Sequence, residues 1–169
     1  MKRENLTILV ADDSEEDRIL LQRALKRCGI DGVSVQTASS GNEAIEYLLG
    51  IGEYQDRAQF PYPTFVLTDL KMPNGDGFTV LEHLKRTPES AVIPTVVISA
   101  SEDGDDVKRA YILGASAYLV KPTDISALNT MIEKLMAFWM ICEVPGVNQN
   151  GVRLDTESVG KLGERFNDG

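Results

Sequence analysis

Cysteine, histidine and long apolar segments are scarce in this sequence. It has two cysteines, Cys28 and Cys142, and one histidine, His83, all in segments expected to be helical. Cysteines without a second sulfur nearby in the sequence are typical of free thiols in a reducing compartment. No apolar stretch approaches the roughly 20 residues that a membrane-spanning helix needs, and the charged N-terminus is unlike a signal peptide. We therefore expect a cytoplasmic protein that does not enter a membrane.

Positive charge is also in short supply. The 169 residues include 26 Asp and Glu against 17 Lys and Arg, for a formal net charge of −9. A nucleic-acid-binding surface needs clustered Lys and Arg, so the composition argues against a nucleic-acid partner. The sequence has neither a P-loop nor a Gly-x-Gly-x-x-Gly after its first apolar run, and we expect no nucleotide cradle. An acidic balance is instead compatible with a cation site or a basic partner surface.

Short β-rich runs alternate with segments of helical periodicity along the chain. Strands are expected at residues 6–11, 33–37, 64–69, 93–99 and 115–121, and helices near 14–28, 41–50, 78–86, 105–114 and 124–144. Strict β-then-α alternation implies parallel strands joined by right-handed crossovers. The pattern predicts an α/β fold, a doubly wound five-stranded parallel sheet with helices on both faces.

The first and last helices carry the most detailed expectations. Ser14 should cap the first helix, with Asp17 as a capping-box partner, and Asp124 should cap the last. The stripe expected to pack on the sheet comprises Ile19, Leu20, Ala24 and Cys28 in the first helix, and Ile125, Leu128, Ile132, Leu135, Trp139 and Cys142 in the last. Outside the stripe of the last helix lie Met131, Met136, Phe138, Met140 and Ile141, which mark a candidate interface.

Two segments lie outside the β-then-α pattern. Residues 51–63 form an unusually long connection, which is either a loop with a specific contact or a helix that runs on into a tolerated insertion. We expect residues 1–143 to form one domain and residues 144–169 to be a mobile or docked tail with no separate output domain. In that tail, Leu154, Val159, Leu162 and Phe166 could form a weak amphipathic turn or two.

Polar side chains end four of the five expected strands. Asp12 and Asp13 follow the first strand, Asp69 the third, Ser99 the fourth and Lys121 the fifth. Taken singly, each has an ordinary structural explanation, such as a helix cap or a turn. In a doubly wound sheet, however, the reactive crevice lies at the carboxyl ends of the strands. We therefore expect these five side chains to meet there.

The types of these side chains indicate phosphoryl chemistry. Clustered carboxylates suit Mg²⁺, or alternatively Mn²⁺, bound together with a phosphate-type group. Zinc has no suitable ligands among the strand-end residues. Beside a divalent cation, a carboxylate can attack phosphorus and form an aspartyl-phosphate. Lys121 and Ser99 would supply donors for the phosphoryl oxygens.

The segments ILVADDSEEDR, FVLTDLKMPNGDGFTVLEHLK, IPTVVISAS and GASAYLVKP resemble the receiver domain of bacterial two-component response regulators, in the order and spacing of that family. The resemblance covers about residues 5 to 142 and implies a flavodoxin-like receiver fold with strand order 2-1-3-4-5. It implies that Asp69 is the phosphoacceptor. Asp12, Asp13, Asp69 and the backbone carbonyl of Lys71 would bind the metal, and Lys121 would pair with the phosphoryl group.

The resemblance also implies a conformational switch. Ser99 would swing toward the phosphoryl group, and Tyr118 would turn inward, although an ordinary strand-end aromatic is the alternative for Tyr118. The Lys121–Pro122 peptide bond would be cis, as in the family. Lys71 and Ser101 occupy the two positions that tune phosphoryl lifetime there, and whether Lys71 hinders or assists the attacking water stays open.

The expected function is that of a stand-alone response regulator. It would take a phosphoryl group from a sensor histidine kinase onto Asp69, without being an enzyme toward other substrates. The last helix and the long connection are similar to regulators that partner phytochrome-type kinases and form homodimers through the last two helices and the fifth strand. One alternative is a phosphorylation-independent interaction module. Another is a Mg²⁺-dependent phosphohydrolase, but Lys71 stands where such enzymes need an acid.

Overall fold

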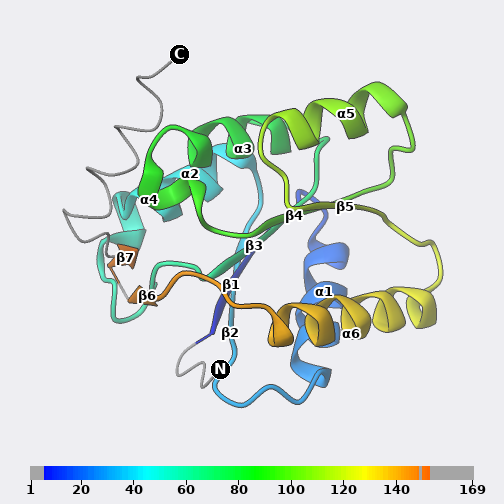
Figure 1. Ribbon diagram of the computed structural model, residues 1–169, viewed down its shortest axis with the longest axis horizontal. Helices are drawn as coiled ribbons and strands as arrows, with labels where there is room; N and C mark the ends of the chain where they lie inside the picture. Colours follow the sequence, from blue (N-terminus) through cyan, green and yellow to red (C-terminus); the bar gives the residue numbers. More distant parts are fainter. Residues whose placement is uncertain (1–5, 149, 153–169) are drawn as a thin grey trace.

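The computed structural model describes residues 6–148 and 150–152. Its central sheet is parallel, with the strand order β2-β1-β3-β4-β5. The strands are β1 (Thr7–Ala11), β2 (Ser34–Ala38), β3 (Phe65–Thr68), β4 (Thr95–Ser99) and β5 (Ala117–Val120). Helices α1 (Glu15–Arg27) and α6 (Ile125–Ile141) cover one face, and α2 (Gly41–Leu49), α3 (Gly77–Lys85) and α5 (Gly104–Ile112) cover the other (Figure 1). The predicted fold class and strand order are confirmed.

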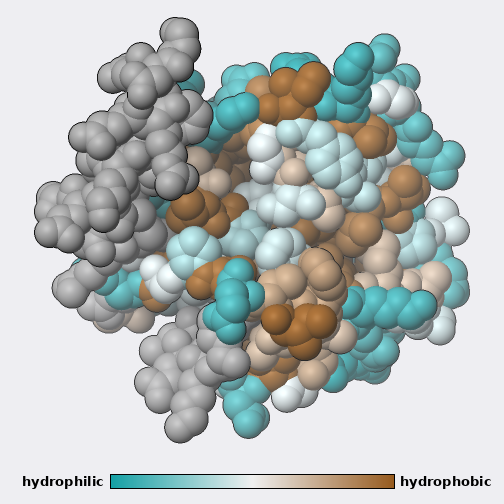
Figure 2. All heavy atoms as spheres, viewed as in Figure 1, coloured by the Kyte–Doolittle hydropathy of each residue, from teal (hydrophilic) through white to brown (hydrophobic). Residues whose placement is uncertain are grey.

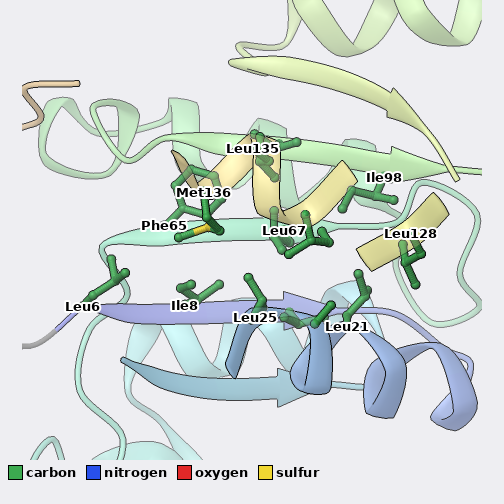
Figure 3. Close-up of a cluster of buried hydrophobic side chains, with 14 residues drawn as sticks. Leu6, Ile8, Leu21, Leu25, Phe65, Leu67, Ile98, Leu128, Leu135 and Met136 are labelled. Carbon is green, nitrogen blue, oxygen red and sulfur yellow. The ribbon is translucent and has the colours of Figure 1, made fainter. Parts of the chain in front are cut away.

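Alternation along the strands divides the core between the two faces of the sheet. In β1, Ile8 and Val10 contact the cluster formed with α1 and α6, whereas Leu9 and Ala11 contact the cluster formed with α2 and α3. Figure 3 shows the first cluster, in which Phe65 lies between the strands and α6. Successive side chains of a strand point to opposite faces, so a strand covered on both faces is apolar throughout.

Helix α1 packs on the sheet through a face that differs from the predicted one. Ser14 caps the helix as expected, but the buried residues are Leu21, Ala24 and Leu25. Ile19 is 39% exposed, so its assignment to the buried stripe was wrong. Residues 21, 24, 25 and 28 follow the i, i+3, i+4, i+7 spacing of one helix face, and Ile19 falls outside it.

Helix α6 begins after its cap Asp124, as predicted, and its buried face also differs from the prediction. The buried residues are Leu128, Ile132, Leu135 and Met136. Met136 therefore belongs to the core and not to the outer surface, because position 136 lies one turn after Ile132. Ile125 is 55% exposed, since contact with the core begins only at Leu128. Two residues expected to lie outside the stripe are exposed, Phe138 by 56% and Ile141 by 80%.

The connection at residues 51–63 makes specific contacts with α2. It contains the short 3-10 helix η1 (Gly52–Gln55). The guanidinium of Arg57 donates to the carbonyl oxygens of Tyr47 (2.8 Å) and Leu48 (2.8 Å), which lie at the C-terminus of α2. The rings of Tyr54 and Phe60 stack edge to face, with centroids 5.1 Å apart. Of the two explanations left open by the sequence, the structure supports a loop with a specific contact.

A short helix and a two-stranded hairpin were also not predicted. Helix α4 (Pro88–Ala91) is a single turn capped by Thr87, and β6 (Val147–Asn148) pairs with β7 (Gly151–Val152) as an antiparallel hairpin. Figure 1 shows the hairpin beside α4, and Val147 packs against the core cluster of α2 and α3. The hairpin therefore packs on the side of the sheet that α2, α3 and α4 cover. Leu154, Val159, Leu162 and Phe166 lie outside the described residues.

No helix within residues 6–148 and 150–152 is both long enough and apolar enough to span a lipid bilayer.

Replacing Arg57 by Ala should destabilise the protein. The side chain satisfies backbone carbonyls at the end of α2 and lies over the rings of Tyr47 and Tyr62. Hydrogen bonds from a charged group contribute about 1.5–3 kcal/mol, so we expect the free energy of unfolding to fall by about 2 kcal/mol in urea titrations. Arg23→Ala, which removes an α1 arginine outside this loop, serves as the control. Equal stability of Arg57→Ala and wild type would contradict the anchoring role.

Candidate functional site

Three carboxylates meet at the carboxyl edge of the sheet. Asp12 follows β1 and Asp69 follows β3, and the N–H of Asp69 donates to the carbonyl oxygen of Ala11 (2.9 Å). One carboxylate oxygen from each of Asp12, Asp13 and Asp69 lies within 4.8 Å of the other two. Asp12 is buried, Asp69 is half-buried and Asp13 is exposed. Hard oxygen donors with one solvent-facing side suit Mg²⁺ or Mn²⁺, which retain some of their water.

Lys121 lies over this cluster. Its Nζ donates to Asp12 Oδ2 (2.8 Å) and to Asp69 Oδ2 (3.2 Å). The backbone N–H of Lys121 donates to the carbonyl oxygen of Ser99 (2.8 Å), which fixes the end of β5 beside β4. Burial opposes charge on this lysine, but the surrounding carboxylates outweigh it and raise the pKa of the ammonium. Burial also raises the pKa of Asp12, against the effect of the ammonium.

The sequence did not point to Asp17 as a residue of the site. Asp17 Oδ2 accepts a hydrogen bond from Lys121 Nζ at 2.9 Å. Its predicted role as a capping-box partner was wrong, because the N–H of Ser14 donates to Asp12 Oδ1 instead. A signal was available, since the first turn of a helix that follows a strand lies beside the carboxyl end of that strand. Asp17 stands in that turn.

The loop between Asp69 and α3 is tightly folded. The carboxylate of Asp69 accepts from the N–H of Leu70 (2.6 Å), and the N–H of Gly77 donates to the carbonyl of Leu70 (2.9 Å). Asn74 and Gly75 have positive φ angles of 56° and 91°, a region where glycine carries no steric penalty. A Cβ atom at Gly77 would collide with the backbone carbonyl oxygen of Asp69. The loop thus holds the Asp69 backbone directly against the start of α3.

The side chain of Lys71 extends toward α5. Its ammonium lies 3.3 Å from Asp106 Oδ2, and the side chain is 70% exposed. Asp106 also accepts from Ser101 Oγ (2.7 Å). The hydrogen bond from Ser101, with help from Lys71, lowers the pKa of Asp106. The sequence identified Lys71 and Ser101 as neighbours of the site, but it did not identify Asp106 as the residue that connects them.

Ser99 and Tyr118 are both held by the backbone of Ser101. Ser99 is buried, and its Oγ accepts from the N–H of Ser101 (3.2 Å). The hydroxyl of Tyr118 donates to the carbonyl oxygen of Ser101 (2.8 Å). Both candidate switch residues are therefore hydrogen-bonded to the same short loop, which follows β4.

The Lys121–Pro122 peptide bond is trans, as are all peptide bonds of the described residues. The expected cis isomer was wrong for this structure. The trans isomer is the intrinsically favoured one, by about 0.5–1 kcal/mol for a bond to proline. In it, the N–H of Lys121 keeps its hydrogen bond to Ser99, and Nζ reaches the cluster.

Comparisons with known proteins agree with this geometry. The profile of the family described as "Response regulator receiver domain" matches residues 8–133. Response regulator Rcp1 of Synechocystis sp. is 35% identical over 133 residues, which cover 79% of this chain and 88% of Rcp1. The crystal structure of the Mn²⁺-bound form of Rcp1 aligns with a TM-score of 0.75 at 33% identity, covering 83% of this chain and 99% of Rcp1.

Two other solved structures align with slightly higher TM-scores. The response regulator RPA3017, described in red light signaling of R. palustris, has a TM-score of 0.77 and 33% identity. The phosphorylated cyanobacterial phytochrome response regulator RcpA has a TM-score of 0.77 and 31% identity. Each alignment covers 84% of this chain and 99% of the other protein.

Replacing Gly77 by Ala should move Asp69 and impair the site. The added methyl group would force the Asp69 carbonyl away from α3, and overpacking of this kind costs about 1–3 kcal/mol. We expect the free energy of unfolding to fall by this amount. In a phosphorylation assay with acetyl phosphate, the rate should fall on the order of tenfold to hundredfold, because a displacement of a reacting group by about 1 Å can cost that much.

Gly104→Ala is the matched control for Gly77→Ala. Gly104 is likewise the first residue of a helix, but a Cβ atom there meets nothing within 4 Å. Its stability and phosphorylation rate should match wild type. Wild-type behaviour of Gly77→Ala would show that close packing at this glycine does not position Asp69.

Proposed function

Because the chain belongs to the response regulator receiver domain family, we propose that it is a single-domain response regulator in which Asp69 accepts a phosphoryl group. One observation carries this proposal. The Asp69 carboxylate stands at the end of the central strand, beside the carboxylates of Asp12 and Asp13 and 3.2 Å from the ammonium of Lys121. A nucleophile, a cation site and a donor for phosphoryl oxygens are thus combined at one place.

The reaction would proceed by direct transfer from a phosphohistidine. A carboxylate oxygen of Asp69 attacks phosphorus, a P–O bond forms, and the P–N bond to the histidine breaks. Asp12, Asp13, Asp69 and the carbonyl of Lys71 would hold a Mg²⁺ ion, or alternatively Mn²⁺. When bound, the ion would neutralise charge on the phosphoryl oxygens. Lys121 would pair with one of those oxygens, as charge stabilisation in phosphoryl transfer requires.

Ser99 and Tyr118 would convert phosphorylation into a change of surface. The Oγ of Ser99 accepts a hydrogen bond from the N–H of Ser101, so a swing of this side chain toward a phosphoryl oxygen would weaken that bond. Tyr118 is bonded to the carbonyl of the same residue. Movement of Ser99 would therefore disturb the loop that holds Tyr118. The phosphoryl group would favour the rearranged state by binding it more tightly.

The protein would be cytoplasmic, and its partner would be a sensor histidine kinase of the phytochrome type. The names of RPA3017 and RcpA, which associate them with red light signaling and with phytochrome, support this assignment. The net charge of −9 supports a protein partner over a nucleic acid. Residues 1–143 would form the receiver domain and residues 144–169 a tail, of which the hairpin β6–β7 is docked on that domain.

A second copy of the chain would bind to the surface formed by α5, β5 and α6. β5 is an edge strand of the sheet, and Val120 on it is 41% exposed. Ile112 on α5 is 62% exposed, and Phe138 and Ile141 on α6 are 56% and 80% exposed. Figure 2 shows hydrophobic residues at the surface over the C-terminal half of α6. An apolar surface beside an open strand edge suits a symmetric homodimer.

Incubation with acetyl phosphate and Mg²⁺ tests the acceptor. Intact-mass spectrometry should show one phosphoryl adduct on the wild type and none on Asp69→Ala, because Asp69 at the end of the central strand is the proposed acceptor. Asp31→Ala, which removes an exposed acid far from the site, should be phosphorylated like the wild type. No adduct on wild type would favour the phosphorylation-independent module, and continuous hydrolysis of phosphate monoesters would favour a phosphohydrolase.

Light scattering tests the dimer. The wild type should have the mass of a dimer with beryllofluoride, a phosphoryl analogue, and Phe138→Ser combined with Ile141→Ser should have the mass of a monomer, because polar side chains at these positions weaken an apolar interface. Leu49→Ser, which alters a residue of α2 that is 54% exposed, is the control and should remain dimeric. A monomeric wild type with and without beryllofluoride would exclude this dimer.

A further inference from the structure

Asp17 gives Lys121 an acceptor outside the carboxylates expected to bind the metal. The ammonium of Lys121 has three N–H donors, and three carboxylates lie within hydrogen-bond distance: Asp12 at 2.8 Å, Asp17 at 2.9 Å and Asp69 at 3.2 Å. Lys121 is therefore fully occupied. Its contact with Asp69 is the longest of the three, and the two shorter contacts are with Asp12, just after β1, and with Asp17, in the first turn of α1.

Asp17 differs from the other two acceptors. Asp12 and Asp69 belong to the group of carboxylates that converge as a cation site, whereas Asp17 lies in the first turn of α1 outside that group. Both oxygens of Asp12 are already in use, Oδ1 by the N–H of Ser14 and Oδ2 by Lys121. A cation entering the site has to share the Asp12 oxygens with these two donors, but it leaves the contact between Asp17 and Lys121 in place.

The same turn of α1 is attached to the site a second time. Arg18 Nη1 donates to the backbone carbonyl oxygen of Asp12 at 2.7 Å. The side chain of Asp17 is 33% exposed, while that of Asp12 is only 2% exposed. Asp17 is thus the acceptor of Lys121 that solvent reaches most easily. Arg18 fixes the helix turn that places it there.

We propose that Asp17 is a positioning residue that shares the charge of Lys121, favouring cation binding and weakening the hold of Lys121 on the phosphoryl group. This inference rests on the proposed function. The carboxylate of Asp17 neutralises part of the charge of the Lys121 ammonium. The ammonium therefore repels a divalent cation at Asp12 and Asp69 less strongly. The same carboxylate repels the phosphoryl oxygens and competes with them for Lys121. Its removal should therefore change the two affinities in opposite directions.

The test uses Asp17→Asn in the full-length protein. Isothermal titration with Mg²⁺ should show an affinity lower by about threefold to tenfold, the size expected for one partly exposed charge near a dication. At saturating Mg²⁺, the affinity for beryllofluoride should instead rise by a similar factor. In the protein without metal, the ¹⁵Nζ resonance of Lys121 should shift, which reports the lost contact independently of any phosphoryl chemistry.

Two variants separate the positioning role from general charge and from folding. Glu16→Gln removes the adjacent acid on the same turn, and both affinities should remain within about twofold of wild type, because an exposed charge without a contact at the site is screened by solvent. Asp17→Glu keeps the carboxylate on a longer side chain and should restore most of both affinities. Circular dichroism should give the same folded spectrum for all variants.

The outcomes distinguish this inference from the proposed function. Wild-type protein that binds neither Mg²⁺ nor beryllofluoride would contradict the proposed function itself. If the wild type binds both, the inference is overturned by an Asp17→Asn variant with unchanged affinities, by a fall in both affinities together, or by the same changes in Glu16→Gln. Opposite changes in Asp17→Asn alone, with recovery in Asp17→Glu, support it.

Discussion

The balance of charge around Lys121 is the constraint on which the site depends. Carboxylates at the ends of β1 and β3 would repel one another if no cation lay between them, and the ammonium of Lys121 takes that place at the end of β5. Burial disfavours the charges of Lys121 and Asp12, and it is opposed by their mutual attraction and by the hydrogen bond from the N–H of Ser14 to Asp12. A divalent cation would compete with the ammonium for the carboxylate oxygens, and a phosphoryl group would attract the ammonium to its own oxygens. Both would therefore change the balance of charge around Lys121.

The sheet supplies the rigidity that this balance needs. The backbone of Asp69 is tied to β1 through Ala11, and that of Lys121 is tied to β4 through Ser99. On the far side of Asp69, Gly77 lets α3 approach until no side chain could fit between them. The charged groups therefore stand on backbone that cannot easily relax. Changes in charge are then met by side-chain movement, for which Lys121, Ser99 and Tyr118 are the candidates.

Much of the architecture could be read from local patterns. The order of strands and helices followed from hydrophobic periodicity, and the position of Asp12, Asp69 and Lys121 at one edge followed from the topology of parallel sheets. The predictions were wrong where the buried face of a helix was assigned from residue spacing alone. Ile19 and Met136 were placed on the wrong sides because consecutive apolar residues in α1 and α6 extend beyond one helix face, and packing against the sheet selects which of them are buried.

The residues missed at the site have a common physical origin. Asp17 and Asp106 stand in the first turns of helices, where an acid is equally well explained by the helix dipole. Their partners, Lys121 and Lys71, come from other segments of the chain, so no local pattern connects them. Composition, periodicity and the residues at strand ends are local properties of the sequence. They were enough to predict the fold and the carboxylates at the centre of the site. The sharing of Lys121 among three carboxylates depends on distances between α1, β1, β3 and β5, which exist only once the sheet is assembled.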